Sequence, residues 1–304
     1  MTLHFMGRFG AKMMDKAISG YYGGQPGHWV GDGFPVRSLF SYGTLGQQSS
    51  PFLLLDYAGP YYFEPTTTRR GVGTHPHRGF ETVTIVYDGD VEHRDSEGHS
   101  GRIGPGDVQW MTAGRGILHQ EYHSPDFAKT GGMFRVVQLW VNLPAKDKLT
   151  KGGYQTLLST EIPTVELPGD AGLARVIAGE LYGVKGPART YTNINVWDVK
   201  LKPEQDLRLE LPVGHTILLV GINGQVKLEE DRSLGEAEMA LLSREGDAIR
   251  LRSMVSGARL LVLTGEPINE PITGHGPFVM NTQDEIREAI RDFNNGAFGH
   301  LAEI

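Results

Sequence analysis

The chain of 304 residues contains no cysteine. Disulfides, cysteine-based zinc sites, iron–sulfur clusters and thiol nucleophiles are therefore excluded, and any metal site has to use histidine and carboxylate ligands. A basic cluster is also missing, since 29 lysine and arginine residues stand against 36 aspartate and glutamate residues, for a formal net charge of −7. Because phosphate backbones are bound by basic patches, we expect no direct contact with nucleic acid.

The sequence also lacks long apolar runs. No stretch reaches the roughly 18 apolar residues that a membrane span needs. Residues 1–20 contain Arg8, Lys12, Asp15 and Lys16, which interrupt the apolar core that a signal peptide would require. From these absences we expect no membrane interaction and a cytoplasmic location.

What is present fits a folded chain rich in strands. Hydrophobic residues make up 39% and charged residues 21% of the chain, which favours a packed core over disorder. The 41 glycines and 17 prolines show no period, so they are typical of many short strands joined by tight turns. A length of 304 residues suits two domains.

Apolar and β-branched segments, bounded by turn residues such as Asp88-Gly89, predict the strands. In the first half the predicted strands cover residues 52–57, 81–87, 91–95, 108–112 and 136–143. In the second half they cover residues 216–220, 225–228 and 258–263. Residues 283–293 have the apolar spacing of an amphipathic helix, with Asn281 or Thr282 as its N-cap.

The two halves have similar length and strand rhythm, which predicts a duplicated barrel. We expect the first barrel over residues 41–150 and the second over residues 165–304, with the C-terminal helix included. Residues 1–40 are rich in glycine and predict an extended arm whose role cannot be read from the sequence. The histidines of the second half are His215, His275 and His300. Because none of these is paired with another, we expect the second barrel to hold no metal.

Metal-competent side chains cluster in the first half, where six of the 11 histidines lie from His75 to His123. His75 and His77 are two residues apart, as are His119 and Glu121, and residues at i and i+2 of a strand share one face. If the two strands face each other across a barrel, three imidazoles and one carboxylate meet. This set suits a first-row divalent cation and leaves coordination positions open, so we interpret it as an oxygen-handling metal site.

The remaining histidines of the cluster lie outside these two pairs. His93 and His99 fall on a polar strand and turn, and we expect them to face solvent or to lie behind the ligands. His123 shares the strand parity of His119 and Glu121 and can line the mouth of the site. A purely structural cation is the alternative to a reactive centre, and four protein ligands without water would favour it.

Four sequence blocks resemble the pirin family of the cupin superfamily, over roughly residues 50–295. The blocks are HPHRGFET, PGDVQWMTAGRGILHQE, QLWVNLP and HGPFVMNT. This resemblance implies an all-β bicupin, which has two tandem cupin-type β-barrels and a short C-terminal helix. It also implies a non-haem iron site in the first barrel and a second barrel that has lost its ligands.

Position by position, the resemblance implies that the metal ligands are His75, His77, His119 and Glu121. The general cupin pattern would instead use Glu81, four residues after His77. We favour Glu121, because it repeats the i, i+2 spacing of the first pair. Glu81 is then expected to hold a ligand imidazole by its N–H, as carboxylates behind metal ligands often do.

The resemblance implies two kinds of function, since pirin-like proteins include quercetin 2,3-dioxygenases and iron-dependent regulators. For a dioxygenase, the partners are O2 and a small aromatic substrate of the flavonol type, and Glu121 is the catalytic base. Fe(II) is the expected cofactor, and the ligands also suit Mn, Co, Ni, Cu and Zn. The alternative function is a redox-sensing regulator that acts through protein partners.

Large apolar residues near the ligands in the sequence are candidates for the walls of a pocket. They are Phe80, Trp110, Met111 and Trp140. Each of these side chains fits an ordinary core position equally well.

Overall fold

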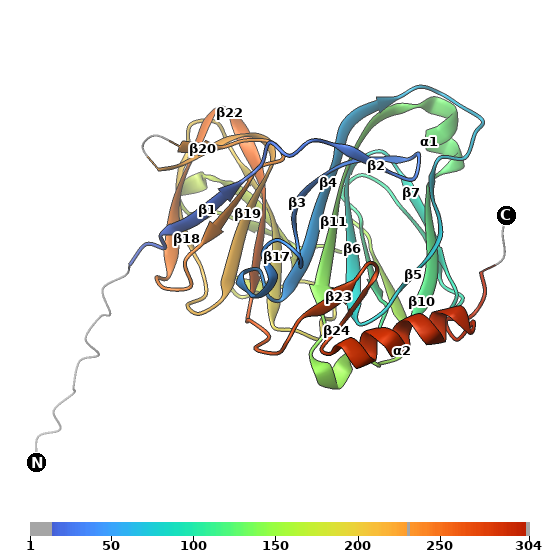
Figure 1. Cartoon of the computed structure of the whole chain (residues 1–304). Helices are drawn as coiled ribbons and strands as arrows, with labels where there is room; N and C mark the ends of the chain where they lie inside the picture. The colour runs from blue at the N-terminus through green and yellow to red at the C-terminus, as the bar shows by residue number, and fades with distance from the viewer. Residues whose placement is uncertain (1–13, 230–231, 302–304) are drawn as a thin grey trace, which may run out of the picture.

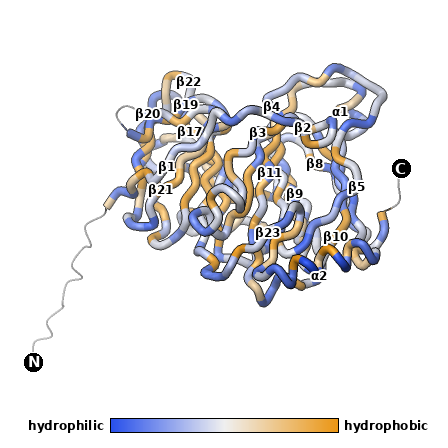
Figure 2. The backbone as a smooth tube through the Cα atoms, viewed as in Figure 1, coloured by the Kyte–Doolittle hydropathy of each residue, from blue (hydrophilic) through white to orange (hydrophobic). Residues whose placement is uncertain are grey.

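The computed structural model describes residues 14–229 and 232–301, which form two barrels of strands that lie side by side (Figure 1). Residues 1–13 of the predicted arm lie outside the described residues. Figure 2 shows apolar residues concentrated along the strands of both barrels. Within the described ranges, no helix is long and apolar enough to cross a membrane.

The strands, in chain order, are β1 (Ile18–Tyr22), β2 (His28–Val30), β3 (Phe34–Ser41), β4 (Phe52–Phe63), β5 (Gly71–His77), β6 (Phe80–Asp88), β7 (Val91–Asp95), β8 (Ser100–Ile103), β9 (Val108–Thr112), β10 (Ile117–His123), β11 (Gly132–Asn142), β12 (Gly153–Leu157), β13 (Thr164–Glu166), β14 (Gly172–Ala178), β15 (Glu180–Leu181), β16 (Val184–Lys185), β17 (Ile194–Leu201), β18 (Asp206–Glu210), β19 (Thr216–Glu229), β20 (Arg232–Leu234), β21 (Met239–Leu242), β22 (Ala248–Gly265), β23 (Thr273–His275) and β24 (Phe278–Met280). The helices are η1 (Gly46–Gln48), α1 (Pro125–Thr130), η2 (Ala145–Asp147), η3 (Pro168–Asp170) and α2 (Gln283–Asn294).

Two sheets form the first barrel. A seven-stranded sheet has the order β12-β9-β6-β11-β4-β3-β2, and a four-stranded sheet has the order β5-β10-β7-β8. Their inner faces pack together through Val86, Val91 and Phe134. The second barrel is a nine-stranded sheet built around the long strands β19 and β22. The all-β prediction, with a short helix near the C-terminus, is therefore confirmed.

Strand β6 separates the inside of the first barrel from the interface with the second. Successive side chains of a strand point to opposite faces. Val83 and Ile85 belong to an apolar cluster that also contains Leu218 of the second barrel. Thr84, between them in sequence, instead bonds to side chains inside the first barrel. The apolar interface between the barrels thus determines which side chains of β6 face inward.

The described part of the predicted arm contains strands of both barrels. Strand β1 pairs with β21 of the second barrel, where Ile18 lies opposite Leu242. Strand β2 pairs with β3, and β3 pairs with β4 of the first barrel. From β1 to β3 the described chain therefore crosses from the second barrel to the first.

The C-terminal segment makes the opposite crossing, as Figure 1 shows. After β22 of the second barrel, β23, β24 and α2 lie against the first barrel, where Phe278 and Ile286 pack near Leu118. Arg78 Nη1 donates to Asp292 Oδ2 at 2.9 Å. Helix α2 begins with a capping box on Thr282, one of the two predicted N-caps.

A buried lysine holds this segment in place. Lys148 Nζ donates to Gly79 O at 2.9 Å, Val279 O at 2.9 Å and Asn142 Oδ1 at 2.7 Å. Burial lowers the pKa of Lys148 to about 7. The three acceptors match the three N–H groups of an ammonium, so one side chain joins β11, β24 and the turn before β6.

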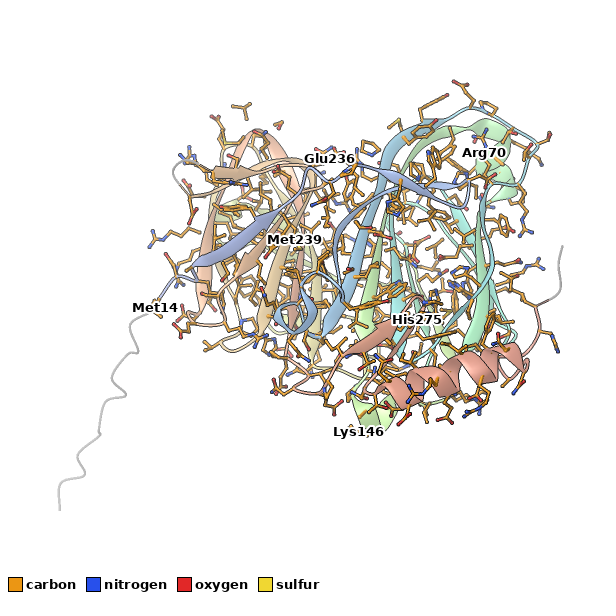
Figure 3. The ribbon with its side chains drawn as sticks, in the orientation of Figure 1. Met14, Arg70, Lys146, Glu236, Met239 and His275 are labelled. Atoms are coloured by element: carbon orange, nitrogen blue, oxygen red, sulfur yellow. The ribbon has the colours of Figure 1, made fainter. Side chains whose placement is uncertain are left out.

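Replacement of Lys148 by methionine should destabilise the fold, because it leaves three buried oxygens without a donor. We expect Lys148→Met to lower the free energy of unfolding by about 2 kcal/mol or more at pH 6, measured by urea denaturation. Lys146 is the matched control, since it lies exposed on the turn below the first barrel (Figure 3). An equal loss in Lys146→Met would contradict the role of the buried ammonium.

Candidate metal centre

The two predicted ligand pairs lie on adjacent strands of the four-stranded sheet. Strand β5 carries His75 and His77, and β10 carries His119 and Glu121. The strands are antiparallel, with His119 opposite His75, and the register shifts between His119 and Glu121. The pairs therefore meet as neighbours in one sheet, whereas the sequence analysis had considered strands that face each other across the barrel.

Three imidazoles converge at this point. The ring centroids of His75 and His119 are 4.2 Å apart, those of His77 and His119 4.8 Å, and those of His75 and His77 4.9 Å. One ligand nitrogen from each ring lies within 4.8 Å of the other two. This spacing allows one cation to contact all three nitrogens.

The electrostatics of the cluster favour neutral imidazoles. Burial lowers the pKa of His77 and of His119 well below 6.5, and the neighbouring imidazoles lower both further. Both ring nitrogens of His119 and Nδ1 of His77 are buried without a hydrogen-bond partner. His75 Nδ1 lies 2.8 Å from Gly73 O, which leaves Nε2 for a ligand. Neutral imidazoles with unused nitrogens are the form that binds a divalent cation, so the residues fit a metal.

Glu121 lies beside His119 and is held by a hydrogen bond. Its Oε1 accepts from Gln109 Nε2 at 2.7 Å and lies 3.2 Å from Thr84 Oγ1. Its carboxylate also forms a second group with His93 and His119, in which the ligand atoms lie within 4.8 Å of one another. His119 is thus shared between two overlapping groups of metal-competent side chains.

His93 does not face solvent, which was one of its two expected placements, but lies buried beside His119. It is 1% exposed, stacks on Tyr154 with 4.6 Å between ring centroids, and lies opposite Glu121 in the pairing of β7 with β10. Its Nε2 lies 3.2 Å from Asp95 Oδ2. Burial would raise the pKa of Asp95, but hydrogen bonds to His93 and His99 hold it below its usual value. The two-residue spacing of His93 and Asp95, which places both side chains on one face of a strand, was the sequence feature that could have indicated this position.

The predicted wall residues occupy three different environments. Phe80 and Trp140 stack with 4.3 Å between centroids, and each ring lies 5.2 Å from that of His77. Trp110 instead belongs to the apolar cluster between the barrels. Met111 packs with Ala113 and Ile117, away from that interface.

Glu81 and His123 also lie elsewhere than the sequence suggested. Glu81 shares the face of β6 that carries Val83, and it accepts a hydrogen bond from Thr112 Oγ1 at 2.7 Å instead of holding a ligand imidazole. His123 Nε2 lies 2.9 Å from Gly33 O. Its ring packs among phenylalanines, with 4.5 Å to the centroid of Phe63, so it lies behind the wall of the site and not at the mouth.

A cavity of about 250 Å³ opens beside the cluster. Its lining is mainly apolar, and consists of Val30, Phe34, Val36, Asp56, Ala58, Val72, His75, His77, Glu121, Val136, Gln138, Trp140 and Pro277. Small-molecule sites usually measure roughly 300–1,000 Å³. This cavity is close to the lower end of that range, which suits a compact, flat ligand.

Among the described residues of the second barrel, no comparable group of metal-competent side chains is found. In the described part of the chain, both groups of metal-competent side chains lie in the first barrel. His215 Nδ1 lies 3.3 Å from Thr264 Oγ1, and His275 is exposed on β23 at the edge of the first barrel (Figure 3).

The fold and this cluster define a bicupin whose first barrel holds histidine and glutamate side chains suited to a divalent cation. Residues 33–141 match the pirin family, and residues 196–299 match the pirin C-terminal cupin domain. The chain belongs to the pirin family. Both the family resemblance and the bicupin fold predicted from the sequence are therefore confirmed.

Individual relatives are similar along most of their length. A Pseudomonas aeruginosa protein, whose name gives quercetin 2,3-dioxygenase as a provisional activity, is 58% identical over 283 residues, which cover 93% of this chain and 98% of the relative. Human pirin is 40% identical over 234 residues, which cover 75% of this chain and 78% of human pirin. The crystal structure of a quercetin 2,3-dioxygenase from Acinetobacter baumannii matches with a TM-score of 0.91 and 54% identity, over 95% of this chain and 100% of that one.

Loss of a single imidazole should remove most of the bound metal. We expect His75→Ala and His119→Ala to retain little divalent metal after loading and desalting, measured by elemental analysis, because each variant leaves two of three converging nitrogens. Both should keep a cooperative thermal transition, since the apolar cores of the two barrels are unchanged. Full occupancy in both variants would exclude this site. His215→Ala, in the second barrel, is the control and should bind as the parent does.

Glu81 should make stability depend on pH. Burial raises the pKa of Glu81 to about 7, against a usual 4.5, although hydrogen bonds from Thr112 and Trp110 oppose the shift. The folded state therefore keeps a proton that the unfolded chain releases, so Glu81 destabilises the fold as pH rises from 4.5 to 7. The full effect is about 3 kcal/mol.

We expect Glu81→Gln to be more stable relative to the parent at pH 8 than at pH 5, because the amide does not ionise. Chemical denaturation at the two pH values measures this difference. Glu166→Gln is a matched control on β13, where the side chain is exposed. An identical pH dependence in the parent and in Glu81→Gln would show that Glu81 ionises normally.

Proposed function

We propose that the protein is a metal-dependent dioxygenase that cleaves flavonol-type substrates in its first barrel. The observation that carries this proposal is the convergence of buried, neutral imidazoles and one carboxylate on the wall of an apolar cavity. The relatives whose names give quercetin 2,3-dioxygenase support the substrate class. O2 is the second substrate.

In this proposal the cation is Fe(II), held by His75, His77, His119 and Glu121. The unpartnered nitrogens of His77 and His119 support this set. Mn, Co, Ni, Cu and Zn suit imidazole and carboxylate ligands as well. When bound, the cation supplies a Lewis acid that lowers the pKa of a chelating hydroxyl and a redox centre for reaction with O2. The adjoining cavity argues against a purely structural cation, whose four ligands would close the site.

Glu121 is the catalytic base of the proposal. Gln109 donates to its Oε1 at 2.7 Å, with Thr84 Oγ1 in contact at 3.2 Å, and so fixes the orientation of the carboxylate. Oε2 has no hydrogen-bond partner among the described residues, and it is the atom that would take the proton of the substrate hydroxyl once its bond to the cation loosens. Trp140 and Val136 line the cavity beside it and give the reacting group an apolar surrounding.

An iron-dependent regulator that acts through protein partners is the second candidate function. An exposed apolar patch on the first barrel favours it. The patch consists of Trp29, Tyr61, Tyr62 and Met133, which are 50%, 43%, 54% and 44% exposed. Trp29 and Tyr61 are in contact, with 5.3 Å between ring centroids, and Met133 lies opposite Tyr62. Exposed apolar groups of this kind mark interaction surfaces.

Turnover of quercetin in air by the Fe(II)-loaded protein tests the proposal. We expect loss of the flavonol absorbance together with release of carbon monoxide, because the reaction opens the central ring and expels one of its carbons. His75→Ala, carried through the same loading, should show at most a few per cent of that rate. If iron is retained but turnover does not exceed that of His75→Ala, the dioxygenase is disfavoured and the regulator is favoured. Protein partners would then be sought by pull-down, with substitutions in the exposed apolar patch as controls.

A further inference from the structure

A row of polar side chains crosses the seven-stranded sheet on the face that lines the cavity. The row consists of Ser38, Asp56, Gln138, Thr84 and Gln109, and each member lies directly opposite the next in the strand register. It ends next to Glu121, which accepts a hydrogen bond from Gln109 and contacts Thr84. Thr84 and Gln109 are buried, whereas Ser38, Asp56 and Gln138 are half-buried. Polar groups removed from water are costly unless each has a partner, so the row can be checked atom by atom.

Most of the row is satisfied internally. Ser38 Oγ donates to Asp56 Oδ1 at 2.5 Å, and Thr84 Oγ1 donates to Gln138 Oε1 at 2.6 Å. Two atoms remain, namely Asp56 Oδ2 and Gln138 Nε2, for which no hydrogen-bond partner exists among residues 14–229 and 232–301. Asp56 and Gln138 both line the cavity. The unsatisfied part of the row is therefore open to a ligand.

Asp56 is the more unusual of these two residues. No ion pair to its carboxylate is found in the described part of the chain, and its neighbours along β4 are apolar. Burial raises the pKa of Asp56, although Ser38 and the charge of His28 oppose the shift. A carboxyl group without an ion-pair partner in a mainly apolar cavity is a candidate for ligand recognition.

The two open atoms are complementary to a hydroxyl group. A hydroxyl both donates and accepts, so it can donate to Asp56 Oδ2 and accept from Gln138 Nε2. Asp56 and Gln138 lie on adjacent strands, and Asp56 is two strands away from Thr84, which contacts Glu121. Two strand spacings are about 10 Å. Val36, Ala58 and Val136 provide apolar surface in the same cavity.

We infer that Asp56 and Gln138 form a recognition subsite for an aromatic hydroxyl group that lies about 10 Å from the oxygens facing Glu121. This inference rests on the proposed function, because it takes the chelating end of the substrate to lie at the metal cluster. The favoured substrates are then flat aromatic molecules with a chelating oxygen pair at one end, an apolar middle and a hydroxyl at the far end.

Binding of three synthetic flavonols tests the subsite without relying on turnover. 3-Hydroxyflavone carries the chelating pair alone, whereas 3,4′-dihydroxyflavone and 3,7-dihydroxyflavone each add one hydroxyl at a different end. Calorimetric titration of the Fe(II)-loaded protein without O2 gives the three dissociation constants. We expect at least one dihydroxy compound to bind about tenfold or more tightly than 3-hydroxyflavone, the usual effect of a hydrogen bond to a charged group.

Substitutions assign that advantage to the subsite. Asp56→Ala should reduce it to less than about threefold, and Gln138→Leu should reduce it in part. Asp56→Asn keeps the shape of the side chain and one acceptor oxygen, so it should retain an intermediate preference. It is the control for the possibility that Asp56→Ala loses the preference by misfolding. Asp206→Ala is the matched control, since Asp206 is exposed on β18 of the second barrel, and it should keep the full advantage.

The possible failures are distinguishable. If the parent binds all three compounds equally, or if Asp56→Ala keeps the preference, the subsite is excluded while the dioxygenase proposal stands. If the parent binds none of them although its iron is in place, both the subsite and the flavonol substrate class are overturned.

Discussion

The two-residue alternation of side chains along the seven-stranded sheet is the constraint on which both the fold and the site depend. One face of β6 contributes Val83 and Ile85 to the interface between the barrels, and the other presents Thr84 to Gln138 and Glu121 inside the first barrel. A slip of one residue in the register would exchange these faces. The large apolar interface therefore also fixes the row of polar side chains in the cavity, although it lies on the opposite side of the sheet.

The same alternation explains how much of the site was predictable. Residues two apart on a strand share a face whatever the tertiary structure, so the pairs His75/His77 and His119/Glu121 were visible in the sequence. The apolar rhythm also predicted the all-β barrels and the C-terminal helix. What these local patterns do not contain is strand pairing, because hydrogen-bonded neighbours in a sheet are distant in the sequence. The sequence analysis accordingly left open how the two pairs would meet.

The features that the sequence analysis missed all depend on pairing between strands. His93 joins the site because β7 lies next to β10. Asp56 reaches the cavity because β4 lies between β3 and β11. Conversely, Glu81 follows the ligand pair closely in sequence, yet strand parity turns it toward the second barrel. A residue close to the ligands in the sequence, such as Glu81, is therefore easily assigned to the site when it does not belong there. A residue on a strand far away in the sequence, such as Asp56, is overlooked.

Each barrel is completed by a described segment from the opposite half of the chain. Strand β1 completes the second barrel, and the C-terminal segment covers the first and supplies Pro277 to the cavity wall. During synthesis the N-terminal part of a chain folds first, so the ligand strands leave the ribosome about 150 residues before their cover does. Until this segment docks, the cavity lacks the wall that Pro277 supplies. The order of translation thus provides an interval in which a cation can enter the first barrel before the cavity acquires its last wall.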